Sequence, residues 1–193
     1  MAKFSIPVTI EKDSSGMERV YDIYSRLLKD RIVFIQAEIS DTYANSIIAQ
    51  LLFLQAVDPD SDITLYINSG GGSVYSGLAI VDTISHISCE VSTIAIGMAA
   101  SMASIILSAG TKGKRYALPH ASVLMHQPYG KHQGQATDIE IQAREILRVR
   151  DVCAEILAGN TNNEKEKILR DFDRDFILTP EDAQAYGFID KIL

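Results

Sequence analysis

The chain has 193 residues, and its hydrophobic fraction of 47% is ordinary for a globular protein that can bury a core of its own. A formal net charge of −7 argues against nucleic acid as the main partner. The two cysteines, Cys89 and Cys153, are too few for a disulfide framework and lack the spacing of a zinc site. No apolar segment of secretory length opens the chain, so we expect a cytoplasmic protein.

Short β-branched runs alternate with longer helical patterns along the first two thirds of the chain. The predicted strands cover residues 31–37, 63–69, 91–96 and 121–126, and the predicted helices cover 42–57, 73–87 and 101–110. This alternation indicates β-α-β crossovers and a largely parallel α/β sheet covered on both faces.

A long helix is predicted from Thr137 to Ala158. Thr137 and Glu140 form a capping-box pattern at its start, and Gly159 is a plausible end. A further short helix is predicted to begin at Thr179 and Pro180. Because no linker or repeat interrupts the chain, we expect residues 1–193 to form one domain.

The longest uncharged stretch of the chain, residues 91–111, lies between Glu90 and Lys112. Its 21 residues could cross a bilayer, but it is rich in serine, threonine and glycine and has no flanking aromatic belt. A buried strand followed by a buried helix fits this composition better than a membrane span.

Three predicted strands end in segments that could carry chemistry: "NSGGGS" (68–73), "GMAAS" (97–101) and "MHQP" (125–128). Sites in parallel sheets form at the carboxyl ends of strands, so these segments are expected to share one edge. The glycines of the first segment allow close backbone approach, and their N–H groups could stabilise an oxyanion. The alternative is a plain strand-to-helix turn.

Ser101 and His126 are the candidate nucleophile and base at this edge. A serine hydroxyl needs a base near neutral pH, and the histidine in turn needs a carboxylate that fixes its tautomer. Without such a partner, Ser101 would simply bond to a helix carbonyl. His86 and His132 are expected to be solvated. The spacing leaves the acid open among Asp171, Asp173 and Asp175.

The sequence closely resembles the ClpP family, the proteolytic subunits of the Clp proteases, over nearly the whole chain. The resemblance rests on the blocks "LYINSGGG", "GMAASMAS", "KGKRYALPHASVLMHQP", "GQATDIEIQAREIL" and "RDFILTPEDAQAYG". It implies a serine peptidase with the crotonase-like α/β fold, built from repeated β-α-β units with a protruding handle near residues 127–158. It also implies an N-terminal axial segment over about residues 1–20.

Matching these motifs implies a role for five residues of this chain. The nucleophile falls on Ser101, the base on His126 and the acid on Asp175. The oxyanion donors fall on the backbone N–H groups of Gly72 and Met102.

The resemblance further implies two stacked seven-subunit rings that enclose the sites, and an AAA+ unfoldase ring that delivers unfolded polypeptides. Tyr66, Tyr116 and Leu118 match the unfoldase-docking pocket. No metal, cofactor, nucleic acid or membrane is implied. Two departures stand out: Gly70 replaces a proline of the usual Ser-Pro-Gly-Gly turn, and Thr64 stands where the family often has tyrosine.

Two other functions compete with the peptidase. A crotonase-type acyl-CoA enzyme would use the same oxyanion loop without a nucleophile, and an inactive structural ring subunit would need no triad. The triad-type residues favour the peptidase over both.

The predicted helix over 137–158 is apolar around most of its circumference. A polar stripe about 60° wide is formed by Arg144, Arg148, Asp151 and Glu155. We expect the surplus apolar face to pack on another subunit; the alternative is that the domain covers it on two sides.

Overall fold

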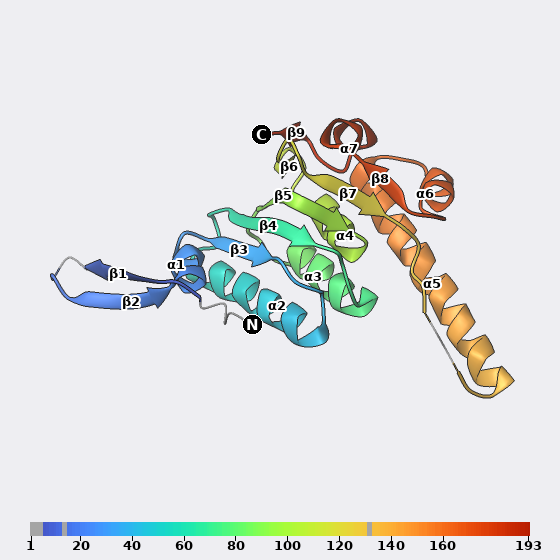
Figure 1. Cartoon of the computed structure of the whole chain (residues 1–193), viewed down its shortest axis with the longest axis horizontal. Coiled ribbons are helices and arrows are strands. Elements are labelled where there is room, and N and C mark those ends of the chain that lie inside the picture. The colour runs from blue at the N-terminus through green and yellow to red at the C-terminus, as the bar shows by residue number, and fades with distance from the viewer. Residues whose placement is uncertain (1–5, 13–14, 131–132) are drawn as a thin grey trace, which may run out of the picture.

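The computed structural model describes residues 6–12, 15–130 and 133–193. Within these residues the main sheet has seven strands, and a separate two-stranded hairpin precedes it (Figure 1). The strands of the main sheet are β3 (Ile32–Ile35), β4 (Ile63–Ser69), β5 (Val91–Ala100), β6 (Arg115–Ala117), β7 (Ser122–Met125), β8 (Phe176–Leu178) and β9 (Lys191–Ile192). The hairpin consists of β1 (Val8–Lys12) and β2 (Glu18–Asp22), which lie in the segment predicted to be axial.

The strand order β3-β4-β5-β6-β9 is parallel throughout. β5 pairs with two strands in succession, because its first half lies beside β6 and its second half beside β7. β8 then pairs with β7 in antiparallel orientation. The predicted α/β architecture with a parallel sheet is confirmed, and the carboxyl ends of β4, β5 and β7 lie at one edge.

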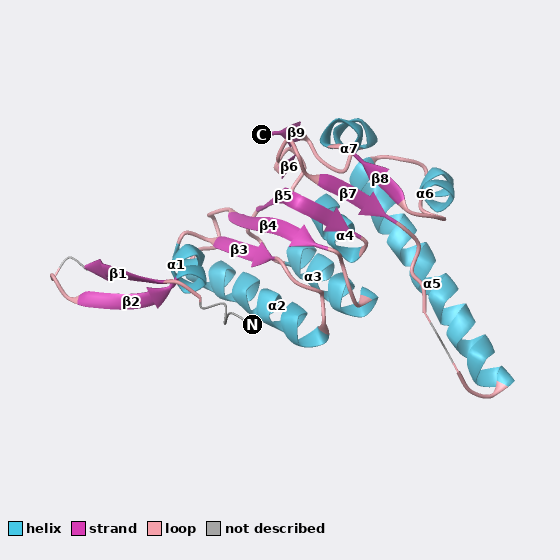
Figure 2. Cartoon of the chain, viewed as in Figure 1, coloured by secondary structure: helices cyan, strands magenta, loops and turns pink. Residues whose placement is uncertain are grey.

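The helices connect the strands, and those that follow β3, β4 and β5 lie on one side of the sheet (Figure 2). They are α1 (Ile23–Lys29), α2 (Asp41–Val57), α3 (Val74–His86), α4 (Met102–Ser108), α5 (Ala136–Thr161), α6 (Lys165–Asp171) and α7 (Pro180–Tyr186). Serine side chains cap two of them: Ser40 accepts from the N–H of the third residue of α2, and Ser73 does the same for α3. Thr179 caps α7 with Pro180 in its first turn, as the sequence predicts.

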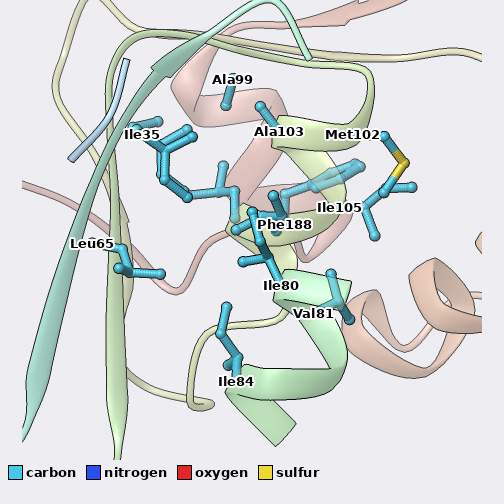
Figure 3. Packing of buried hydrophobic residues seen from close by; sticks show 14 of the residues in the cluster. Ile35, Leu65, Ile80, Val81, Ile84, Ala99, Met102, Ala103, Ile105 and Phe188 are labelled. Atoms are coloured by element: carbon cyan, nitrogen blue, oxygen red, sulfur yellow. The ribbon is translucent and has the colours of Figure 1, made fainter. Parts of the chain in front are cut away.

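The core lies between the sheet and the helices that follow its strands. Figure 3 shows Leu65 of β4, Ile80 of α3 and Ile105 of α4 directed into one cluster. Leu65 and Ile80 are fully buried, and truncating such side chains to alanine costs about 2–5 kcal/mol each. The core therefore fixes the three strand ends that carry the candidate residues.

Coverage of the sheet is less even than predicted. In β4, the buried residues Ile63, Leu65 and Ile67 alternate with the partly exposed Thr64 and Tyr66. This period-2 pattern shows that one face of β4 packs on the core while the other is only partly covered within the chain. The prediction of a sheet buried on both faces is therefore wrong for this strand.

β5 is longer than predicted and runs through Ala100 rather than ending at Ile96. Its extension pairs with β7, starting at Met98 opposite Ser122. The side chain of Asn68 occupies the space beside Gly97 and accepts a hydrogen bond from the Met98 N–H at 3.1 Å. "GMAA" is thus strand, and the turn is confined to Ser101.

α5 begins and ends beyond the predicted limits. Its N-cap is Gln135, and the N–H of Ile139 already donates to the Gln135 carbonyl at 3.0 Å, so Thr137 lies inside the first turn and forms no capping box. At the other end the helix continues past Gly159 to Thr161. Asn162 adopts the left-handed conformation that ends it, with φ 58°.

None of the described helices combines the length and the apolar character that crossing a bilayer requires.

Candidate active site

Ser101 occupies the single-residue turn between β5 and α4. Its backbone has φ 55° and ψ −126°, a conformation that costs a non-glycine residue about 1–3 kcal/mol. The Ser101 N–H donates to the carbonyl of Leu124 in β7 at 2.9 Å, and the Ser101 carbonyl accepts from the hydroxyl of Ser104 at 2.7 Å. These contacts fix the backbone of the turn.

The Ser101 side chain makes no capping bond to α4 although it holds the N-cap position. Its Oγ lies 3.0 Å from Nε2 of His126, and Nδ1 of the same imidazole lies 2.9 Å from Oδ1 of Asp175. The three side chains therefore form one continuous chain of hydrogen bonds. With the proton on Nδ1, the imidazole donates to Asp175 and leaves Nε2 free to accept from the Ser101 hydroxyl.

Strand pairing places His126 opposite Asp175. β7 and β8 are antiparallel with Met125 opposite Phe176, so the next pair in that register is His126 and Asp175. β7 also lies beside the end of β5, which brings His126 to Ser101. Three segments far apart in sequence thus meet because β7 lies between the other two strands.

The other candidate acids have different partners. Asp171 accepts a hydrogen bond from the hydroxyl of Tyr186 at 2.7 Å. Asp173 accepts one from the side-chain amide of Gln127 at 2.9 Å. Of the three aspartates that the spacing left open, the structure brings Asp175 to the imidazole.

The side chain of His126 is 23% exposed, whereas that of Asp175 is 66% exposed. A carboxylate in contact with water interacts with a neighbouring charge through a high effective dielectric, which weakens their attraction. The hydrogen bond between Nδ1 of His126 and Asp175 therefore acts mainly by orienting the imidazole ring.

Of the glycines after β4, Gly71 lies against Ser101 and Gly72 lies against Ile39. A Cβ at Gly71 would come within 2.6 Å of the Ser101 Cβ, and one at Gly72 would come within 2.5 Å of the Ile39 carbonyl oxygen. Ile39 bridges the loop by donating its N–H to the Gly71 carbonyl and accepting from the Ser73 N–H, both at 2.8 Å. The bridge uses the residues on either side of Gly72, so the N–H of Gly72 is not part of it.

Met102, the residue after Ser101, is the first residue of α4. Its N–H belongs to the first turn, where no intrahelical acceptor exists. A cavity of about 450 Å³ is lined by Gly72 together with Ser101 and His126. The residues of both predicted oxyanion donors therefore lie beside the candidate nucleophile.

A smaller cavity of about 220 Å³ lies next to this one, between α3 and α5. Its walls include Val74, Pro128 and Ile146, of which Val74 and Pro128 also line the larger cavity. At its rim Glu145 accepts hydrogen bonds from Arg148 and Tyr75, which lower the pKa of its carboxyl to about 2.

The residues matched to the docking pocket lie away from the candidate site. Tyr66 of β4 and Tyr116 of β6 stand in one cross-strand row, with Ile94 of β5 between them. Tyr66 also stacks on Phe34 of β3, with ring centroids 5.5 Å apart. Leu118 is 39% exposed just beyond β6.

Of the remaining histidines, His86 is exposed at the end of α3, as expected, and His120 is exposed as well. His132 lies outside the described residues. Across residues 6–12, 15–130 and 133–193, no three His, Cys, Asp or Glu side chains are arranged to hold a metal ion.

Two residues near the site, Ser69 and Gln127, make contacts that the sequence alone did not predict. Gln127 donates its N–H to the Phe172 carbonyl at 2.6 Å, and its side-chain amide bonds to Asp173, which ties the loop before Asp175 to the strand that carries His126. Ser69 binds the glycine loop through its hydroxyl. Their positions within the "MHQP" and "SGGG" motifs were the available signal.

A family model described as "Clp protease" matches residues 15–193, which is nearly the whole chain. The chain belongs to the Clp protease family. Its α/β fold with a parallel sheet is that of ClpP-type proteins, and membership in this family supports a peptidase.

Proposed function

We propose that the chain is the serine endopeptidase subunit of an ATP-dependent protease, acting as one peptidase domain. The observation that carries this proposal is the continuous hydrogen-bond chain from Ser101 through His126 to Asp175. A crotonase-type acyl-CoA enzyme would need only the glycine loop and gives no reason for this chain of contacts. An inactive ring subunit would likewise have no need of the strained backbone at Ser101.

In the proposed reaction, the Ser101 Oγ attacks the carbonyl carbon of a peptide bond while Nε2 of His126 takes the hydroxyl proton. The carbonyl oxygen becomes an oxyanion that accepts hydrogen bonds from the N–H groups of Gly72 and Met102. The imidazolium then gives its proton to the departing amine. Water hydrolyses the acyl-enzyme with His126 again acting as the base, and Ser101 is regenerated.

The smaller cavity supports a preference for substrates with an apolar side chain next to the scissile bond. It adjoins the cavity of the proposed nucleophile and has largely apolar walls from Val74, Ile146 and Val149. An apolar side chain next to the scissile bond would bury its surface there. The substrates are unfolded polypeptides that offer such side chains.

We further propose that the subunits assemble as two stacked seven-subunit rings in the cytoplasm, served by an AAA+ unfoldase. Exposed apolar side chains on α5, among them Ile139, Ile141 and Leu147, support a contact between subunits. The row that contains Tyr66 and Tyr116, together with Leu118, supports a docking surface for the unfoldase.

Labelling with a fluorophosphonate tests the serine mechanism. The Ser101 Oγ should displace fluoride and form a phosphonyl ester, and mass spectrometry of a proteolytic digest should locate it on the peptide that contains residue 101. Buried serines such as Ser108 provide an internal control. Absence of the adduct, together with turnover of an acyl-CoA thioester, would favour the crotonase-type enzyme instead.

A further inference from the structure

Ser69 is the last residue of β4 and is 4% exposed. Its Oγ donates a hydrogen bond to the Ala37 carbonyl at 2.6 Å and accepts one from the Gly71 N–H at 3.1 Å. A single buried hydroxyl thereby joins the segment before α2 to the glycine loop.

The same loop is held from a second direction by Ile39. The backbone of Ile39 bonds to the Gly71 carbonyl and to the Ser73 N–H. Ser69 holds the N–H of Gly71 and Ile39 holds its carbonyl, so the two peptide groups that flank Gly71 are both fixed. The second of these peptide groups contains the N–H of Gly72.

The backbone of Gly70 is not restrained by a side chain of its own. It is exposed, and a Cβ built on it would meet no atom within 4 Å. A proline ring would restrict the backbone at this position, and glycine does not. The position of the loop therefore depends on the hydrogen bonds that Ser69 and Gly71, the residues on either side of Gly70, make.

We propose that Ser69 is a positioning residue for the oxyanion site: its hydroxyl anchors Gly71 and so holds the N–H of Gly72 where a developing oxyanion would accept its hydrogen bond. This inference rests on the proposed serine mechanism. Oxyanion donors act only when they are already placed about 3 Å from the charge that forms. A loosened loop would therefore weaken binding of the transition state more than binding of the substrate.

The test compares Ser69→Ala with Ser108→Ala. Ser108 is a matched control because its buried hydroxyl also donates to a carbonyl, that of Ile105 at 2.7 Å, and accepts from one N–H, that of Asn160 at 3.1 Å. We expect Ser69→Ala to lower kcat for a fluorogenic peptide by about 10- to 100-fold, less than the loss of a whole donor, with KM changed by less than about threefold. Ser108→Ala should leave both constants close to wild type.

A second variant, Ser69→Cys, fills nearly the same space with a weaker donor and acceptor and guards against misfolding of the alanine variant. Its kcat should fall between those of wild type and Ser69→Ala. Its thermal unfolding midpoint should be close to that of Ser108→Cys, the matching cysteine variant of the control position. Wild-type kcat in both Ser69 variants, or equal losses in the Ser69 and Ser108 variants, would overturn the positioning role.

Ser101→Ala in the same assay separates the two hypotheses. If Ser101→Ala is inactive while the Ser69 variants are fully active, only the positioning inference is wrong. If Ser101→Ala remains active, the serine mechanism is wrong and the inference falls with it.

Discussion

Ser101 departs from the side-chain contact and the backbone conformation that a serine normally adopts at a helix N-cap. A serine at an N-cap ordinarily bonds to the first turn of its helix, a contact worth about 1 kcal/mol, yet Ser101 makes no such bond to α4. It also holds a positive φ. Departures from local preference of this kind concentrate at functional sites, and here both leave the hydroxyl beside His126.

The proposed acid can be tested by isosteric substitution. Asp175→Asn should lower kcat for a peptide by up to about 10⁴-fold, because an amide can hold the imidazole in the wrong tautomer. The matched control is Asp171→Asn, which removes the carboxylate that bonds to Tyr186 but does not touch the imidazole. Steady-state kinetics of both variants would decide the assignment, and equal losses of kcat would contradict it.

The C-terminal strand β9 is held to β6 by a partly buried ion pair between Arg115 and Asp190. Nη2 of Arg115 lies 2.6 Å from Asp190, and the Arg115 side chain is 6% exposed. Burial opposes ionisation of Asp190, but hydrogen bonds from Arg115 outweigh it and hold the pKa of the Asp190 carboxyl below its ordinary value. A carboxyl with a lowered folded-state pKa stabilises the fold above its unfolded pKa and loses that contribution as the pH falls through the folded pKa.

We therefore expect Asp190→Asn to lower the free energy of unfolding by about 3 kcal/mol at neutral pH, because it leaves the buried Arg115 charge without its partner. The difference from wild type should begin to shrink below about pH 4, where the Asp190 carboxyl of the unfolded chain takes up a proton, and should be lost as the pH falls through the lower pKa of the folded state. Urea unfolding at fixed protein concentration measures this. Asp30→Asn, which breaks the exposed pair with Arg26, should cost less than about 1 kcal/mol. A pH-independent difference for Asp190→Asn would show that the ion pair with Arg115 is not the source of the stability.

The first half of α5 extends away from the sheet, and its residues are largely exposed (Figure 1). Burial begins near Val149 and continues through Cys153 and Leu157. The alternative in which the domain covers this helix on two sides is therefore wrong for its N-terminal half. Apolar residues such as Ile141, which is 56% exposed, remain available for a contact with another subunit.

Ile141→Glu should place a charge in that contact, at a cost of several kcal/mol per subunit unless it rearranges. We expect the assembly to separate into single rings or smaller species and peptide cleavage to fall with it. Arg144→Glu adds a carboxylate to the polar stripe of the same helix and should preserve both. Sedimentation velocity and a peptide assay on one sample test this, and a full-size, active Ile141→Glu assembly would exclude a coupled contact.

The local sequence pattern was sufficient to predict much of the fold and part of the candidate site. The alternation of β-branched runs and helical stretches predicts β4, α2 and α3 closely. The register of β7 and β8 depends on long-range pairing, so spacing could not choose among aspartates two residues apart. The resemblance selected Asp175. The hairpin β1–β2 and the early start of α5 at Ala136 had no sufficiently strong local signal.

Exposed apolar side chains lie at both extremities of the molecule. The hairpin exposes Val8, Ile10 and Val20, and α5 exposes Ile139 and Ile141 at the other extremity (Figure 2). A chain with apolar surface at both ends is suited to assembly, and it supports the proposal of a closed ring that shields the site.

An enclosed chamber predicts a difference between substrates. The isolated protein should cleave short peptides but should spare a stably folded protein, because only unfolded chains can enter. Adding an unfoldase and ATP should allow degradation. Gel analysis of a folded fluorescent protein and a peptide in parallel tests this, and loss of the folded protein without ATP would contradict the enclosure.

Whether Ser101 is the nucleophile is tested by peptide hydrolysis with Ser101→Ala, compared with wild type in samples of the same assembly size. Removing the nucleophile of a Ser-His-Asp triad costs about 10⁶ in turnover, because attack and proton transfer are lost together. We expect Ser101→Ala to cleave peptide only at the background rate while its assembly keeps the wild-type size. Retention of more than a few per cent of wild-type turnover by Ser101→Ala would contradict this assignment.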